Sequence, residues 1–282
     1  MDAQELKRKL DAAHYVYDDS LVTTLLVALQ LGRPLLIEGA AGVGKTEIAK
    51  VMAQALDREL VRLQCYEGLD ESKALYEWNY QKQLLSIQVQ MNRQDPEELT
   101  RSLFSDEYLL ERPLLKSIRS EKPVVLLIDE IDKADLEFPN DLLWELDQME
   151  FYIPETRETV RARQRPIVII TSNAEKELPD AFLRRCVFHY IEFPDREQME
   201  RIVRVHLPDI EEALVEQALE AFYWLRGLRD IEKKPSTSEL VDWLRAMVAG
   251  GVDPRRIERE IPFAGVLLKK DKDLQLLQKS KR

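Results

Sequence analysis

The sequence predicts an α/β fold, in which helices cover both faces of a parallel sheet to give three layers, followed by a smaller all-helical domain. Three observations favour this class. Continuous apolar runs rich in β-branched residues, typical of parallel strands buried on both faces, occur at 124–128 and 167–170. A glycine-rich loop follows an earlier apolar run at 35–37 and precedes apolar residues at helical spacing. After residue 193 we find only helical spacing.

The N-terminal part of the chain alternates helices with strands. Apolar residues at helical spacing predict a helix over 20–31, which leads into a strand over 34–37. The same spacing over 48–56 predicts the helix that follows the glycine-rich loop. Over 61–65 apolar and polar residues alternate, which is typical of a short strand. The order of strand, loop, helix and strand is that of an α/β unit.

Two further elements lie between the continuous apolar runs. Apolar spacing predicts an amphipathic helix over 138–149, and two short extended segments around a polar turn predict a β-hairpin near 151–163. The hairpin is basic, for which we favour a solvated turn over a subunit contact, and a subunit contact over nucleic-acid binding. Its basic residues are Arg157, Arg161, Arg163 and Arg165.

The pattern changes at Phe193-Pro194-Asp195, where strand candidates end. The sequence therefore predicts an α/β domain over 1–193 and a helical domain over 194–282. Within the second domain, Ser236 and Glu239 have the S-x-x-E spacing of a capping box, so a helix is expected to begin there.

The composition is acidic, with 41 Lys and Arg against 52 Asp and Glu and a net charge of −11 over 282 residues. This balance disfavours broad binding to nucleic acids or anionic membranes and favours protein partners. Cys65 and Cys186 are the only cysteines and have no CxxC spacing, and the three histidines complete no metal-ligand pattern, so neither a disulfide framework nor a zinc site is expected. The N-terminus is charged and no apolar run reaches roughly 18 residues, so we expect a cytoplasmic protein without a membrane span.

The strongest motif is a GxxxxGKT phosphate loop directly after the apolar run at 35–37. Its glycines let consecutive backbone N–H groups surround phosphate oxygens, the Lys45 ammonium reaches the β- and γ-phosphates, and the Thr46 hydroxyl joins a Mg²⁺ shell. A nucleoside triphosphate with Mg²⁺ is therefore the expected ligand, and an ordinary glycine-rich βα turn is the alternative. The predicted phosphate-binding residues are Gly39, Ala40, Ala41, Gly42, Val43, Gly44, Lys45 and Thr46.

The second motif is the acidic pair Asp129-Glu130 at the C-terminal end of the run at 124–128. Ligands of open parallel sheets bind outside these strand ends, so we expect Asp129 to hold Mg²⁺ through water and Glu130 to orient and deprotonate the attacking water. A carboxylate pair favoured by a helix dipole is the alternative. Asn173 ends the next apolar strand, where its amide can reach both the attacking water and the γ-phosphate, although Asn is also common in turns.

Four segments in this order resemble the AAA+ ATPases: GAAGVGKT at 39–46, VVLLIDEIDKAD at 124–135, IVIITSN at 167–173 and LPDAFLRRC at 178–186. The last segment resembles the MoxR family within them. The resemblance is close from Leu35 to about Arg185 and looser in the helical tail. It implies a three-layer nucleotide domain, a helical lid, and a homo-oligomeric ring, usually a hexamer, with ATP at each subunit boundary.

The resemblance also implies an arginine that reaches the neighbouring subunit's ATP, an effect worth roughly 10³–10⁵ in rate. Arg184 and Arg185 stand at this place, and we prefer Arg185 because the family usually has Asp-Arg there. A solvent-facing arginine is the alternative. The family commonly carries an arginine at the start of a lid helix, where this sequence has the stretch 236–238. Either another arginine, such as Arg226 or Arg229, contacts the phosphate, or the lid responds weakly to nucleotide.

A further stretch is similar to the loop that MoxR-like proteins insert into their second helix. Tyr76, Trp78 and Tyr80 alternate there, and they either grip a client polypeptide as exposed aromatics or pack in a buried strand.

The resemblance implies a Mg²⁺-dependent ATPase whose ring remodels or matures a partner protein, as a chaperone for metalloenzyme assembly or with a von Willebrand factor A (VWA) domain protein. One alternative is a nucleic-acid motor or loader, which would need a basic helix-turn-helix or winged domain for which 194–282 offers no candidate. Another is a slow nucleotide-gated binding switch, against which Glu130 argues.

Overall fold

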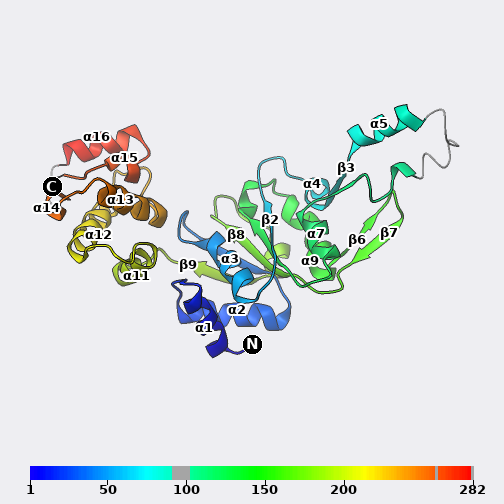
Figure 1. The fold of residues 1–282 in the computed structure, drawn as a ribbon, viewed down its shortest axis with the longest axis horizontal. Helices are drawn as coiled ribbons and strands as arrows, with labels where there is room; N and C mark the ends of the chain where they lie inside the picture. The colour runs from blue at the N-terminus through cyan, green and yellow to red at the C-terminus, as the bar shows by residue number, and fades with distance from the viewer. Residues whose placement is uncertain (91–101, 258–259, 281–282) are drawn as a thin grey trace. The chain divides into compact units, whose positions relative to one another are not determined.

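A computed structural model describes residues 1–90, 102–257 and 260–280 (Figure 1). Its contacts divide the chain into two units, each with its own apolar core. The units alternate along the N-terminal sequence, and the domain boundary expected between 193 and 194 stays a prediction. The sheet unit comprises Met1–Lys9, Asp18–Glu38 and Thr46–Tyr190, and the helical unit comprises Leu10–Tyr17, Gly39–Lys45 and Ile191–Arg282.

A parallel sheet of five strands, in the order β2-β5-β8-β1-β9, forms the centre of the sheet unit (Figure 1). Leu126 of β5 pairs with Val61 of β2 on one side and with Val168 of β8 on the other. All of β5 is buried, as expected for a central strand with helices on both faces. The predicted α/β fold is thus confirmed. The strands are β1 (Leu35–Gly39), β2 (Leu60–Gln64), β5 (Val125–Asp129), β8 (Ile167–Ser172) and β9 (Val187–Ile191).

Helices flank this sheet, and their ends follow local sequence signals (Figure 1). The helix α2 begins after Asp18, whose carboxylate accepts the N–H of Leu21, and ends at Gly32 in the left-handed conformation. The single helix expected over 138–149 is interrupted at Leu142. The helices described before β9, of which α5 extends away from the sheet, are α1 (Ala3–Ala12), α2 (Asp19–Leu31), α3 (Lys45–Ala55), α4 (Glu71–Leu75), α5 (Tyr80–Gln90), α7 (Pro113–Arg119), η1 (Ile131–Lys133), α8 (Phe138–Asp141), α9 (Leu143–Gln148) and α10 (Asp180–Leu183).

The aromatic stretch at 76–80 divides between packing and exposure. The strand β3 (Tyr76–Trp78) pairs antiparallel with β4 (Leu109–Glu111). Trp78 is buried, and the Tyr76 ring stacks on Phe151 at a centroid distance of 6.0 Å. Tyr80 begins α5 and is 66% exposed. Strand packing therefore accounts for two of the three rings, and Tyr80 is the ring that remains available to a partner.

The expected hairpin is formed by β6 (Glu150–Ile153) and β7 (Glu158–Arg161). The side chains of Arg161 and Arg163 are mostly exposed, in keeping with a solvated turn. Arg165 differs, because its guanidinium donates to the carbonyl oxygens of Gly32 (2.8 Å), Asp147 (3.0 Å) and Leu146 (2.9 Å). These carbonyls lie at the ends of α2 and α9, where helices leave backbone acceptors without partners. Arg165 is therefore a structural residue.

The helical unit packs its helices around Phe222 and Trp243, which are fully buried. The predicted capping box is confirmed, since Ser236 and Glu239 exchange side-chain and backbone hydrogen bonds at the start of α13. In the described residues after Ile191 the structure has no strand. The helices are α11 (Arg196–His206), α12 (Glu212–Gly227), α13 (Thr237–Ala249), α14 (Pro254–Ile257), α15 (Ala264–Leu267) and α16 (Asp271–Lys279).

Candidate functional site

The phosphate loop at 39–45 has the backbone that its glycines permit. Gly42 and Gly44 have φ values of 78° and 92°, in the left-handed region that side chains disfavour. The Lys45 ammonium is buried and donates to the carbonyl oxygens of Gly39 at 2.7 Å and Ala40 at 2.8 Å. Lys45 is also the first residue of the helix α3, whose N-terminal N–H groups favour anions. The loop therefore combines glycines in the left-handed conformation, a buried cation and the N-terminus of a helix.

Within the helical unit, this loop lies against the start of α13. A Cβ atom added to Gly42 would come within 2.5 Å of the Ser236 Cβ, so no side chain fits there. Arg226 stacks on the Phe193 ring at 3.3 Å from its centroid and also donates to the Pro235 carbonyl. Burial lowers the pKa of Arg226. The N-cap residue of α13 that meets Gly42 is thus a serine and not an arginine.

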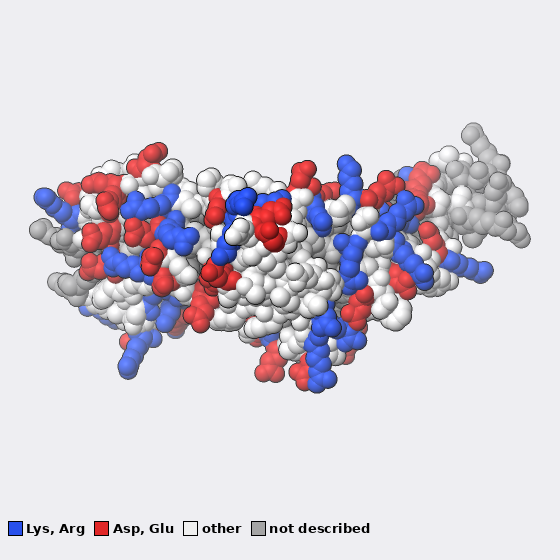
Figure 2. Space-filling model, turned by 90° about the horizontal axis from the view of Figure 1, so that it is seen from below, with Lys and Arg blue, Asp and Glu red and all other residues white. Residues whose placement is uncertain are grey.

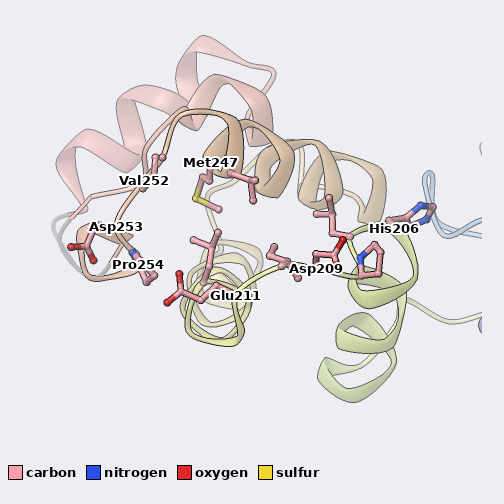
Figure 3. Close-up of a pocket in the computed structure, with 13 residues that line it drawn as sticks. His206, Asp209, Glu211, Met247, Val252, Asp253 and Pro254 are labelled. Atoms are coloured by element: carbon pink, nitrogen blue, oxygen red, sulfur yellow. The ribbon is translucent and has the colours of Figure 1, made fainter.

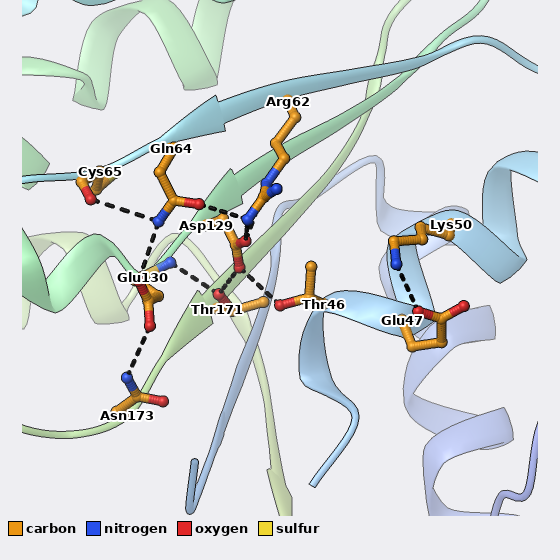
Figure 4. Close-up of polar contacts among 10 residues, drawn as sticks. All are labelled: Thr46, Glu47, Lys50, Arg62, Gln64, Cys65, Asp129, Glu130, Thr171 and Asn173. Atoms are coloured by element: carbon orange, nitrogen blue, oxygen red, sulfur yellow. Dashed lines mark hydrogen bonds and ion pairs between the residues drawn. The ribbon is translucent and has the colours of Figure 1, made fainter. Parts of the chain in front are cut away.

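Asp129 is the centre of a polar network in the sheet unit (Figure 4). It is the last residue of β5 and is 1% exposed. Its Oδ1 accepts the hydroxyls of Thr46 at 2.9 Å and Thr171 at 2.6 Å. Its Oδ2 accepts two N–H groups of Arg62, from Nε at 3.1 Å and from Nη2 at 2.5 Å. The carboxylate is thus fully partnered, which a buried charge requires.

Glu130 follows directly and is held at both carboxylate oxygens (Figure 4). Its Oε2 accepts the amide of Gln64 at 3.0 Å, and its Oε1 accepts the amide of Asn173 at 3.3 Å. The backbone of Glu130 has φ 56°, an unfavourable conformation for a residue with a side chain. Its N–H donates to the Thr171 hydroxyl at 2.8 Å, which stabilises this conformation. A strained residue with an oriented carboxylate is typical of a functional site.

The strand register brings these side chains together. Gln64 lies opposite Asp129, and Ile128 lies opposite Ile170, so the carboxyl ends of β2, β5 and β8 meet at one edge of the sheet. Ligands bind at this edge in open α/β folds. Asp132 shapes the turn after β8, because its Oδ2 accepts the N–H groups of Asn173 at 3.1 Å and Glu175 at 3.0 Å.

Three members of the network were not expected as site residues. Arg62 and Gln64 are the polar positions of the alternating strand at 61–65, and this alternation predicts that both side chains face solvent. Thr171 follows a continuous β-branched run, where threonine is expected simply because it is common in strands. The sequence signal that could have found them is their place at strand ends next to Asp129.

A substitution at Thr171 should show how much the network contributes to stability. Thr171→Val keeps the β-branched shape but leaves the Glu130 N–H without a partner and removes a donor to Asp129. We expect the free energy of unfolding to fall by about 1–3 kcal/mol in urea denaturation. The control is Thr23→Val, whose exposed hydroxyl bonds only the Asp19 carbonyl and should matter by less than about 0.5 kcal/mol. Equal stability of the two variants would contradict this assignment.

The donor set at Asp129 fits a magnesium ion held with nucleotide. Mg²⁺ keeps several waters and binds through one or two carboxylates together with substrate phosphates. The Thr46 hydroxyl is a ligand of this kind, and the Asp129 carboxylate, which accepts this hydroxyl at 2.9 Å, lies where it can hold a metal-bound water. Nowhere in 1–90, 102–257 or 260–280 do three or more His, Cys, Asp or Glu side chains form a metal cage. Phosphate oxygens and water would therefore complete the shell.

A pocket of about 370 Å³ lies next to Glu130 in the sheet unit. Burial, together with the charge of Asp129, raises the pKa of Cys65 to about 12, so this thiol is not a nucleophile at neutral pH. Glu130 also lines this pocket, and its hydrogen bonds to Gln64 and Asn173 orient its carboxylate. The pocket is lined by Cys65, Tyr66, Glu67, Glu130, Asp132, Lys133, Glu175 and Lys176.

The two candidate arginines differ in their surroundings. Arg185 pairs with Asp147 at 2.5 Å and donates to the Ala181 carbonyl at 2.9 Å. The Arg184 side chain is exposed and makes no hydrogen bond or ion pair with any residue that the structure describes. Both lie at the end of α10, on the surface of the sheet unit.

A second pocket, of about 610 Å³, lies within the helical unit (Figure 3). Met247 and Leu214 contribute apolar surface, and Asp209, Glu211 and Asp253 contribute carboxylates. None of the predicted site residues lines it. Among the described helices, none has the length and apolar character that a bilayer span requires.

Comparisons with known proteins agree with the α/β fold. The family of AAA domains of the dynein-related subfamily matches residues 34–186. Midasin of Giardia intestinalis is 30% identical over 205 residues, which cover 68% of this chain and 4% of midasin. The gas vesicle ATPase GvpN of Haloferax mediterranei is 26% identical over 72% of this chain and 59% of its own length. An uncharacterized protein of Staphylococcus haemolyticus is 23% identical over 82% of this chain and 81% of its own. Because the family match covers more than half of the chain, the chain belongs to the dynein-related subfamily of AAA domains.

Proposed function

We propose that this chain binds ATP with Mg²⁺ and hydrolyses it, and that the energy drives remodelling or maturation of a partner protein. The observation that carries the proposal is the network at the strand ends, in which Thr46 bonds Asp129 while Gln64 and Asn173 hold Glu130. The similarity to a gas vesicle ATPase supports nucleotide hydrolysis.

Each residue has a role in this proposal. Residues 39–45 bind the phosphates through backbone N–H groups and the Lys45 ammonium. Thr46 and Asp129 hold Mg²⁺, which when bound offsets charge on the phosphates. Glu130 orients a water molecule and accepts its proton, and Asn173 fixes the Glu130 carboxylate.

We further propose the MoxR type of assembly for this chain. The ring is a homo-oligomer, of six subunits in the usual case, and an arginine of the pair Arg184 and Arg185 acts on the neighbour's nucleotide. The partner is a protein client or a VWA-domain protein. No observation favours a nucleic-acid motor: on the face drawn in Figure 2, basic and acidic side chains are interspersed instead of forming one basic patch.

Removal of the Lys45 ammonium tests the proposal. Lys45→Ala should weaken binding of a fluorescent ATP analogue by roughly 10–100-fold, because a charge-assisted contact to phosphate is lost. The matched control is Lys50→Ala, whose ammonium pairs with the exposed Glu47 and should bind as wild type. Unchanged binding by Lys45→Ala would contradict the phosphate site. Binding without turnover by the wild type would favour a nucleotide-gated switch.

A further inference from the structure

Arg62 makes a contact that the proposed chemistry does not use. Two N–H groups of its guanidinium reach a single oxygen of Asp129, Oδ2 (Figure 4). The Asp129 side chain is 2% exposed, whereas that of Arg62 is 51% exposed. A buried carboxylate is therefore neutralised by the Arg62 guanidinium of the edge strand β2. About half of the Arg62 side-chain surface faces solvent.

Donors from the chain occupy both oxygens of Asp129. An ionised carboxylate offers about four acceptor positions on its two oxygens. The hydroxyls of Thr46 and Thr171 use Oδ1, and Arg62 uses Oδ2. A carboxylate that holds Mg²⁺ through water has to accept a hydrogen bond from that water, so one of these donors must leave.

Arg62 is the donor that can leave. Thr171 is buried in β8, and its hydroxyl also accepts the Glu130 N–H. The Thr46 hydroxyl is itself a proposed metal ligand. The Arg62 side chain can rotate into water, where its charge is solvated. Charge favours the same exchange, because two cations beside one carboxylate repel each other.

We propose, building on the proposed ATP site, that Arg62 is a resident counter-ion of Asp129 that competes with Mg²⁺ and moves off Oδ2 when metal-bound nucleotide is held. Arg62 also bonds the Gln64 side-chain oxygen, and the Gln64 amide bonds Glu130. Release of Arg62 therefore removes one restraint on the residue that positions Glu130. Arg62 thereby sets the Mg²⁺ concentration at which the site fills.

The test is a Mg²⁺ titration of the full chain with a fluorescent, non-hydrolysable ATP analogue, repeated with Mn²⁺ and read by electron paramagnetic resonance. Arg62→Gln should lower the metal concentration at half-maximal binding by roughly 5–30-fold, because the competing ion pair is gone. Arg62→Lys should fall between the two, since an ammonium lacks the planar fork. The control Lys50→Gln removes a positive charge from α3 without touching Asp129 and should match wild type.

An equal metal requirement for wild type and Arg62→Gln would overturn the inference. A higher requirement for Arg62→Gln would also overturn it, because Arg62 would then support metal binding. If Arg62→Gln fails to fold, Arg62→Lys decides, and an unchanged requirement in this variant overturns the inference. Failure of the wild type to bind the analogue at any metal concentration would overturn the ATP site itself.

Discussion

Glu130→Gln should retain ATP and Mg²⁺ binding but turn over roughly 10²–10⁴ times more slowly than wild type, because an amide cannot accept a proton from water. The side chain keeps its size, so the backbone at φ 56° and its hydrogen bond to Thr171 should persist. One contact changes, since the amide donors of Gln64 and Asn173 now face a group with a single oxygen. Steady-state phosphate release and analogue binding are the measurements.

Glu67→Gln is the matched control for this change. Glu67 lines the same pocket and is exposed, and it loses the same charge without touching Asp129 or Asn173. We expect its turnover to equal that of wild type. Wild-type turnover by Glu130→Gln would show that another group takes the proton, and loss of analogue binding would show that Glu130 supports the fold of the site instead.

The second large effect concerns the arginine that acts between subunits. Arg185→Ala should lower turnover by roughly 10³–10⁵, because charge on the transferring phosphoryl is no longer stabilised. The pair with Asp147 does not prevent this role, since both side chains are more than a third exposed and such pairs contribute about 0–1 kcal/mol. Asp147→Asn should accordingly leave Arg185 functional and turnover near that of wild type.

Mixing variants separates action on a neighbour from action within one chain. Arg185→Ala and Lys45→Ala should each be nearly inactive alone, but a mixture forms some boundaries with Lys45 intact on one side and Arg185 intact on the other. The mixture should therefore exceed the sum of its parts, once labelled subunits have been shown to exchange. An inactive mixture despite exchange would contradict action on the neighbour by Arg185. The same mixture with Arg184→Ala tests the unpaired arginine.

The central strands and the capping box were predictable because a single local pattern determines each of them. Continuous β-branched runs gave β5 and β8, and the S-x-x-E spacing gave the start of α13. These features depend on residues that are close together in the sequence, so local sequence patterns are enough to predict them.

The edge strand β9 shows why other elements could not be predicted. Its aromatic residues Phe188 and Tyr190 are about half exposed, while His189 between them is buried. Burial lowers the pKa of His189, although the nearby Asp18 charge opposes this. The polar residue thus faces inward and the apolar residues outward, which reverses the usual alternation.

Arg62 illustrates the same limit at the site. Its partner Asp129 is distant in sequence, and only the register of β2 on β5 brings them together. The alternation of apolar and polar residues correctly indicates that the Arg62 side chain lies outside the apolar core. It does not indicate which carboxylate the Arg62 guanidinium contacts.

The three carbonyl contacts of Arg165 bear on where this protein tolerates changes of length. They fix the chain to the ends of α2 and α9 just before β8 begins. The turn at 154–157, by contrast, is mostly exposed, and besides its two strands a hydrogen bond from the Tyr76 hydroxyl to the Glu155 carboxylate at 2.9 Å connects it to β3. Residues inserted at that turn would lengthen the hairpin only. Because Arg165 holds the chain between the hairpin and β8, the sheet edge with Asp129 and Glu130 would keep its geometry. The hairpin tip is therefore the place where new binding segments can be grafted onto this fold.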